Sequence, residues 1–242
     1  MTDRLRLTGV TRAYRGGAGV RGVDLDVQSG EVHALVGLNG AGKSTLMKLM
    51  VGMLRPDAGE LAVLGADVRI ADPDRWARVG AVIEYPLAYG ELDGRTNLEL
   101  AARLRGVPAR RIRPMVDDVL AELDLHRYAG VPARRMSLGN KQRLGLAAAL
   151  QHRPDLIVLD EPTNALDPAG IILLREALLR RAADGAGVLV SSHHLDEVAR
   201  IATRITVIAD GRVVGRLDPD GVDIERSFFA LVHAATSSGA RS

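Results

Sequence analysis

The segment that most constrains the fold of this 242-residue sequence is the glycine-rich turn Gly37-Leu-Asn-Gly-Ala-Gly-Lys-Ser44. It fits the pattern G-x-x-x-x-G-K-[ST] and lies between an apolar run, residues 31–36, and a helical pattern, residues 43–53. Glycines let the backbone curl so that its N–H groups face bound phosphates, and a helix N-terminus adds a favourable dipole. The motif therefore predicts a site for a nucleoside triphosphate and leaves the class of protein open.

Each residue of this turn has an expected contact. Backbone N–H groups would contact the phosphates from Gly37, Asn39, Gly40, Ala41 and Gly42. Lys43 would reach the β- and γ-phosphates, the Ser44 hydroxyl would bind Mg²⁺, and Thr45 would cap the helix or contact a phosphate. A chance turn ending in Lys-Ser is the competing interpretation. We disfavour it because the only lysines are Lys43, Lys48 and Lys141, and the first falls between a predicted strand and a predicted helix.

A pair of acids follows another apolar run, Leu156–Leu159. The run ends in Asp160 and Glu161, and the carboxyl ends of parallel strands open onto a ligand crevice. Asp160 is expected to hold Mg²⁺ through water, and Glu161 to polarise the water that attacks the γ-phosphate. Solvated acids at a strand end are common, but their presence together with a phosphate-binding turn favours a hydrolytic site.

Apolar patterns along the chain predict an α/β fold. Strands buried on both faces are expected at residues 31–36, 79–83, 156–159 and 188–190. Helices are expected at residues 43–53, 169–183 and 196–203. Alternation of this kind indicates a parallel sheet covered by helices.

Two regions interrupt the alternation. Short β patterns at residues 5–10, 22–27 and 60–63, separated by glycine turns, predict an antiparallel flank. A helical pattern spans residues 97–125. We therefore expect one nucleotide-binding unit, residues 1–218, with a helical insert at about residues 87–140. Residues 219–242 are expected to form a short helix and a disordered tail at residues 236–242. The helix carries Phe228, Phe229, Leu231 and Val232, and we expect it to pack onto the unit rather than to dock a partner.

Taken together, these residues resemble the ATPase cassettes of ABC transporters over residues 5–214. The segment Met136-Ser-Leu-Gly-Asn-Lys-Gln-Arg143 is similar to the family signature LSGGQ. Asn164-Ala-Leu-Asp167 is similar to the D-loop, and Ser191-Ser-His193 to the switch-histidine motif. Tyr14 lies upstream, where the family has an aromatic residue that stacks on adenine. The resemblance implies a P-loop NTPase core with ATP and Mg²⁺ as its nucleotide and metal.

The resemblance also implies a head-to-tail dimer that sandwiches two ATP molecules, from two copies of this chain or from this chain and a relative. Ser137 and Gly139 of one protomer would face the γ-phosphate that the other protomer holds, and Asp167 would contact the partner. His193 would hold Glu161 and the attacking water in place. Each residue also has a plain structural interpretation: Ser137 as a helix cap, His193 as a solvated residue, and Tyr14 as a strand tyrosine.

Two departures from the family pattern stand out. Leu138 replaces the first glycine of the signature, and Asn140 replaces its glutamine. Glu84 stands where the family has the glutamine of its Q-loop. A carboxylate there could bind Mg²⁺, although it brings negative charge toward the γ-phosphate. The segments IEYP and SLGNKQRLG resemble the exporters that protect producers from bacitracin or lantibiotic-like peptides.

The expected function is the ATP-hydrolysing subunit of an exporter, at the cytoplasmic face of a membrane that the chain does not cross. No stretch approaches the roughly 18 apolar residues of a membrane span. A separate permease chain is therefore expected, in contact with residues 84–97. Cysteine is absent, and the net charge of +2 gives no reason to expect a nucleic-acid partner.

Two other classes of function stay open at this stage. One is a soluble ABC ATPase, such as one that serves iron–sulfur assembly, because chain length does not separate it from a transport ATPase. The other is a P-loop kinase, which would use the same phosphate-binding turn. The signature-like segment and His193 speak against a kinase.

Overall fold

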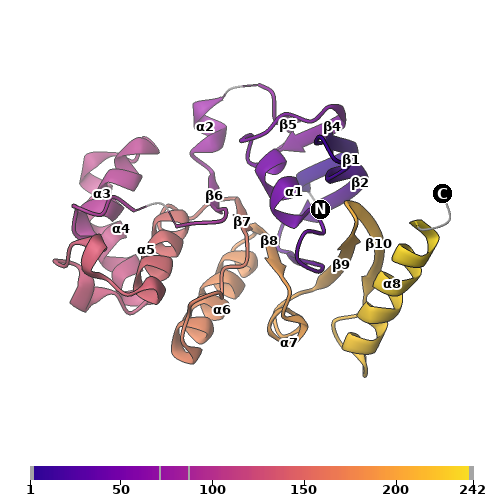
Figure 1. Ribbon diagram of the computed structural model, residues 1–242. Coiled ribbons are helices and arrows are strands. Elements are labelled where there is room, and N and C mark those ends of the chain that lie inside the picture. Colours follow the sequence, from indigo (N-terminus) through magenta and orange to yellow (C-terminus); the bar gives the residue numbers. More distant parts are fainter. Residues whose placement is uncertain (1–2, 71, 87, 240–242) are drawn as a thin grey trace.

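The computed structural model describes residues 3–70, 72–86 and 88–239, and in this part of the chain the larger sheet has the strand order β10-β9-β3-β8-β7-β6 (Figure 1). Its strands are β3 (Val32–Val36), β6 (Val79–Val82), β7 (Leu156–Leu159), β8 (Gly187–Ser192), β9 (Arg204–Ala209) and β10 (Arg212–Leu217). All neighbours pair in parallel except β9 and β10, which form a hairpin. The parallel sheet predicted from the apolar runs is confirmed, and its carboxyl-terminal edge collects the loops after β3, β6, β7 and β8.

A second sheet is antiparallel, with the order β2-β1-β4-β5. Its strands are β1 (Asp3–Ala13), β2 (Gly19–Gln28), β4 (Ala58–Val63) and β5 (Ala66–Asp67). This is the predicted antiparallel flank. Its first two strands are longer than expected because polar outward-facing residues at their ends hide the alternating pattern, while backbone pairing between β1 and β2 continues from Asp3 to Ala13.

Helices cover much of the larger sheet. They are α1 (Lys43–Met50), α2 (Pro73–Trp76), α3 (Gly94–Leu104), α4 (Ala109–Glu122), α5 (Leu138–Leu150), α6 (Pro168–Ala183), α7 (Leu195–Ala199) and α8 (Ile224–Gly239), with short 3-10 turns at His126–Tyr128 and Ala133–Arg135. Figure 1 shows α3, α4 and α5 gathered on the side of the molecule away from the antiparallel sheet, and α8 alongside β10. No helix in the described part of the chain has the length and apolarity to cross a membrane.

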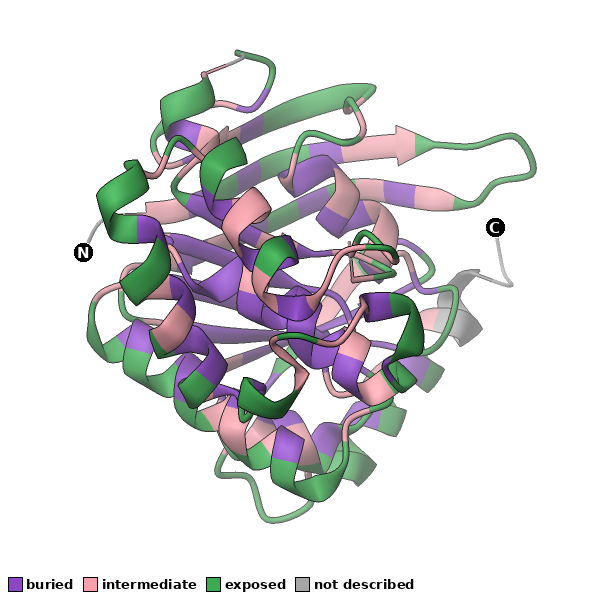
Figure 2. Ribbon diagram, turned by 90° about the vertical axis from the view of Figure 1, so that its left-hand side faces the viewer, coloured by how far each residue is buried: buried purple, intermediate pink, exposed green. Residues whose placement is uncertain are grey.

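The central strands serve two cores at once. Ile157 and Leu159 of β7 pack with the helices α3 to α8, whereas Leu156 and Val158 pack toward α1 and the antiparallel sheet. Buried residues therefore fill the middle of the molecule and exposed ones mark the outer helix faces (Figure 2). Burial on both faces explains why these strands are continuous apolar runs rather than alternating ones.

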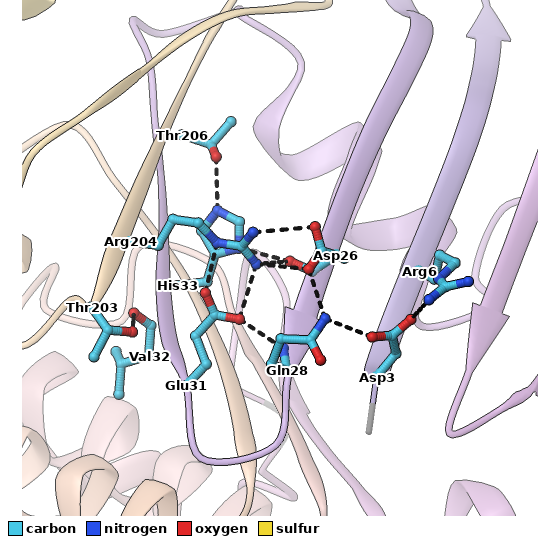
Figure 3. A network of polar contacts seen from close by, with 10 residues as sticks. All are labelled: Asp3, Arg6, Asp26, Gln28, Glu31, Val32, His33, Thr203, Arg204 and Thr206. Carbon is cyan, nitrogen blue, oxygen red and sulfur yellow. Dashed lines mark hydrogen bonds and ion pairs between the residues drawn. The ribbon is translucent and has the colours of Figure 1, made fainter. Parts of the chain in front are cut away.

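A polar network joins the two sheets (Figure 3). His33 of β3 is 2% exposed, and its Nδ1 lies 2.9 Å from the backbone oxygen of Asp26 on β2. Its Nε2 lies 2.8 Å from the Thr206 hydroxyl of β9. Arg204 donates to the carboxylates of Asp26 and Glu31, at 3.0 and 2.9 Å. Polar groups at this depth are stable because each has a partner.

Three expectations about helices need correction. The pattern at residues 97–125 forms two helices, because Gly106 (φ 71) and Pro108 break it. The helix expected at 196–203 ends at Ala199, since the Thr203 amide and hydroxyl both bond to the Val32 carbonyl and draw the chain toward the sheet. The tail was wrongly expected to be disordered from residue 236, because α8 continues to Gly239; residues 240–242 lie outside the described ones.

Candidate nucleotide-binding site

A cavity of about 360 Å³ opens at the carboxyl edge of the larger sheet. It is lined by Tyr14, Ala18, Gly19, Asn39, Gly40, Ala41, Gly42, Lys43, Ser44, Thr45, Glu161, Asn164 and His193. Because β3, β8 and β7 are neighbours in the sheet, the loops that follow them meet at this point. The phosphate-binding turn, the second of the two acids and the histidine of the switch-like motif are thus brought together in one place.

Helix α1 begins in this cavity with free N–H groups. Gly42, the residue before the helix, has φ 105°, a left-handed conformation that glycine adopts without a steric penalty. No side chain caps the helix, so the N–H groups of its first turn face the cavity unpaired and suit an anion. Lys43 is only 6% exposed, and its Nζ donates to the Gly37 carbonyl at 2.7 Å. The lysine is thereby folded back over the turn.

Ser191 organises the two acids. Asp160 is buried, and its Oδ1 accepts the Ser191 hydroxyl proton at 2.6 Å. The same hydroxyl oxygen accepts the Glu161 backbone N–H at 2.9 Å. The Asp160 backbone is in turn tied to the end of β6, since its N–H donates to the Val82 carbonyl at 2.9 Å. The acids therefore have a fixed backbone position relative to the phosphate-binding turn.

The Glu161 carboxylate bridges two cavity residues. Its Oε1 lies 3.3 Å from Lys43 Nζ, and its Oε2 lies 2.6 Å from His193 Nδ1. Glu161 also has φ 48°, an unfavourable conformation for a residue with a side chain. A strained backbone that aims a carboxylate at a lysine and a histidine is typical of a functional site.

Tyr14 reaches the outer end of the same cavity. It lies in the turn between β1 and β2, where its N–H donates to the Ala18 carbonyl at 2.9 Å. Its side chain is 39% exposed, which leaves a ring face open to a ligand. Tyr14 is not part of a strand, because β1 ends one residue earlier, at Ala13.

The signature-like segment lies outside this cavity. Ser137 caps α5, accepting the Asn140 N–H at 3.3 Å, and is exposed. Gly139 sits so close to the D-loop-like segment that an added Cβ would lie 2.5 Å from the Ala165 carbonyl oxygen. Asp167 caps α6 by accepting the Gly170 N–H at 2.9 Å. Ser137 and Gly139 are thus not among the residues that line the cavity.

Glu84 also lies apart from the cavity lining. It follows β6, has φ 62°, and places Oε1 2.5 Å from Nζ of Lys48 on α1. Lys48 is one helical turn beyond Ser44, so the ion pair holds the Glu84 carboxylate against α1. The Glu84 carboxylate is paired with Lys48, and its role as a metal ligand stays a prediction.

Sequence reasoning missed three residues of this site. Ser191 stood in a quoted motif without a role, although a hydroxyl at the end of an otherwise apolar strand is a signal for one. Lys48 was noticed only as one of the few lysines. Asn164, which lines the cavity, was quoted only within the D-loop-like segment. The partners of these residues come from distant parts of the chain, and one sequence does not show such pairs.

Comparison with known proteins identifies the class to which this fold and site belong. The family described as ABC transporter matches residues 20–164 of the 242. The chain therefore belongs to the ABC transporter family, as an ATP-binding subunit, and membership implies that it binds and hydrolyses ATP. The resemblance inferred from the motifs is confirmed.

Two relatives and one solved structure are similar to this chain over most of its length. The lantibiotic transport ATP-binding protein SrtF of Streptococcus pyogenes is 34% identical over 90% of this chain and 92% of its own. The bacitracin transport ATP-binding protein BcrA of Bacillus licheniformis is 31% identical over 91% of this chain and 71% of its own. The post-hydrolysis dimer of the ATP-binding cassette MJ0796, bound to ADP and phosphate, superposes with a TM-score of 0.78 at 26% identity, over 90% of this chain and 99% of that one. That cassette is thus a dimer with ADP and phosphate bound.

Proposed function

We propose that this chain is the ATP-hydrolysing subunit of an exporter for an antimicrobial peptide or drug-like compound, and that it protects its host from that compound. The observation that carries the hydrolytic part is the Lys43–Glu161–His193 bridge inside the cavity at the α1 N-terminus. The names of the similar lantibiotic and bacitracin transport proteins support the class of cargo.

Each cavity residue has its own role in the proposed reaction. Turn N–H groups and Lys43 hold the phosphates of ATP, and Glu161 orients the attacking water and accepts its proton. His193 Nδ1 lies 2.6 Å from the Glu161 carboxylate and holds it in place. The same histidine would hydrogen-bond to the γ-phosphate. When ATP enters, its γ-phosphate takes Lys43 from Glu161, so the same movement that binds substrate frees the carboxylate for water. In this proposal Glu161 is the ion-pair partner of Lys43 and also the group that activates water.

The side chains near this cavity fit Mg²⁺. The Ser44 hydroxyl and the Asp160 carboxylate are oxygen donors, which Mg²⁺ prefers, and Ser191 fixes the orientation of Asp160. Mg²⁺ held there, with Glu84 as a further candidate ligand, would neutralise charge that develops on the transferred phosphoryl group. Two or three protein oxygens together with phosphate oxygens form an ordinary Mg²⁺ site.

A second protomer completes the site in this proposal. Ser137 and Gly139 lie at the exposed start of α5, far from their own phosphate-binding turn in the chain, and would meet the γ-phosphate of the partner. Asp167 would contact the partner from the start of α6. A mixing experiment tests this arrangement: Lys43→Ala and Ser137→Ala are each inactive alone, and a mixture recovers part of the ATPase activity. Without recovery, two copies of this chain do not assemble head to tail.

The permease contact is proposed at the segment between β6 and α3. Asn97 shapes this segment: its Oδ1 accepts the Tyr89 N–H at 2.7 Å, and its Nδ2 donates to the Leu92 carbonyl at 3.0 Å. Tyr85 and Tyr89 are 83% and 52% exposed there. Aromatic side chains on a shaped, exposed loop suit a protein partner, and the loop begins at Glu84, next to the nucleotide site.

Co-purification from the native host tests the transport part of the proposal. The chain would be tagged, membranes solubilised in mild detergent, and bound proteins identified by mass spectrometry. We expect to recover a polytopic permease, which would hold this chain at the cytoplasmic face of the membrane. Recovery of an active ATPase from the soluble fraction with no membrane partner would instead assign the chain to the soluble ABC ATPases.

A further inference from the structure

Arg12 lies against the Tyr14 ring. The guanidinium carbon of Arg12 is 5.4 Å from the centroid of that ring, within the range of a cation–π contact. Tyr14 lines the nucleotide cavity and Arg12 does not. The cation therefore contacts a ring that also faces the cavity, and neither the fold nor the reaction described above assigns a role to Arg12.

Asp57 holds Arg12 in this position. Its Oδ1 accepts from Arg12 Nη1 at 2.7 Å, and its Oδ2 accepts the Ala13 N–H at 2.8 Å. The Asp57 N–H in turn donates to the Thr11 carbonyl at 2.8 Å. The Ala13 amide and the Arg12 guanidinium keep the pKa of the Asp57 carboxyl below its ordinary value, so the carboxylate stays charged. One aspartate thus fixes both the end of β1 and the side chain that contacts Tyr14.

These contacts restrain a ring that would otherwise be free to turn. Tyr14 is 39% exposed and follows the last residue of β1, so strand pairing does not orient its side chain. A stacking ring that must be ordered on binding costs side-chain entropy, and a ring ordered beforehand does not. A cation near the ring adds an electrostatic attraction that persists when a base covers the open face.

We propose that Arg12 is a positioning residue, anchored by Asp57, that holds the Tyr14 ring in the orientation in which it stacks on the adenine of ATP. This inference rests on the proposed nucleotide site and deepens it. Arg12 acts through Tyr14 on the base and leaves the phosphates to the α1 N-terminus. Its contribution therefore depends on the presence of a base.

Calorimetric titration with ATP and with inorganic tripolyphosphate, which has no adenine base, separates binding through the base from binding through the phosphates. Arg12→Gln is expected to weaken ATP binding about two- to fivefold, the range of an exposed cation–π contact, and to leave tripolyphosphate binding unchanged. Arg12→Lys keeps the cation and should recover part of the loss. Asp57→Asn, which removes the charge of the anchor, should weaken ATP binding in the same base-dependent way.

Arg15→Gln is the matched control, because it removes the same charge from the residue that follows Tyr14 in the sequence. Equal losses for ATP in Arg12→Gln and Arg15→Gln, or equal losses for ATP and tripolyphosphate, would show general attraction of an anion and overturn the role of Arg12. Unchanged ATP affinity in Arg12→Gln would overturn it as well. A wild-type chain that binds neither ligand would instead defeat the proposed nucleotide site, a separate result.

Discussion

Two lysines near the candidate site form ion pairs with carboxylates. Lys43 is shared between the Gly37 carbonyl and Glu161, and Lys48 is taken by Glu84. Each pair places a carboxylate where ATP or its metal would bring a competing charge. In the proposed site, ATP binding would therefore exchange ion-pair partners as well as fill the cavity.

Glu84 and Lys48 should act in opposite directions on metal dependence. Glu84→Gln removes a candidate ligand and should raise the Mg²⁺ concentration for half-maximal ATPase activity, with measurable activity retained. Lys48→Met releases the carboxylate and should lower that concentration. Coupling between the two in stability should be small, about 0.2–1 kcal/mol, because both side chains are partly exposed.

A double variant provides the control for this prediction. Lys48→Met should have no effect on the Mg²⁺ titration once Glu84→Gln is present. If Mg²⁺ and Mn²⁺ titrations coincide in the wild-type chain and in Glu84→Gln, Glu84 has no part in metal binding.

At the scale of elements, the site depends on which strand ends are neighbours. The runs 31–36, 156–159 and 188–190 predicted strands, and their following residues predicted the chemistry, because buried parallel strands have a strong apolar signal. The β9–β10 hairpin was missed, although Asp210-Gly211 between two apolar runs is a hairpin signal. Sequence patterns showed the parts of the candidate site, but not that Glu84 pairs with Lys48 or that Ser191 links two acids, since these contacts cross from one element to another.

The start of α5 and the D-loop-like segment should act as one unit. Gly139→Ala places a methyl group 2.5 Å from the Ala165 carbonyl oxygen, so one of the two segments must move. We expect a loss of about 1–3 kcal/mol in the free energy of unfolding. The start of α5 would meet the partner's ATP, so its displacement should lower the rate of ATP hydrolysis on the order of a hundredfold. The affinity of the isolated chain for ATP should stay unchanged.

Leu138→Ala is the control for this change, because Leu138 is 66% exposed beside Gly139. Chemical denaturation and steady-state hydrolysis would be measured for both variants. Gly139→Ala with wild-type stability and hydrolysis would show that the close contact with Ala165 carries no function.

At the scale of the whole molecule, the two sheets are joined by buried polar groups whose charge state matters. Burial lowers the pKa of His33 to about 4, and burial likewise lowers the pKa of His152 to about 3. Both residues are neutral in the folded chain. Since Nδ1 of His33 faces a carbonyl, the neutral ring donates there and accepts from Thr206.

Acid should therefore weaken the fold well above the pH at which carboxylates titrate. An unfolded histidine takes up its proton near pH 6.5, whereas folded His33 does so near pH 4, so protons favour the unfolded chain between these values. The contribution of neutral His33 to the free energy of unfolding is fully present above about pH 6.5. As the pH falls to 4, this histidine alone should lower the free energy of unfolding by about 3 kcal/mol. Urea denaturation from pH 7.5 to 4 would measure it. His33→Gln should show a shallower dependence, and an unchanged slope would remove His33 as a cause.

The central claim is that Glu161 activates water for attack on ATP held by Lys43, and one measurement tests it most directly. Phosphate release and ATP affinity would be compared for the wild-type chain and Glu161→Gln, each purified with its membrane partner. Hydrolysis should fall about 10²–10⁴-fold, while ATP binds at least as tightly, because the neutral amide no longer competes for Lys43. Undiminished hydrolysis in Glu161→Gln would contradict the account.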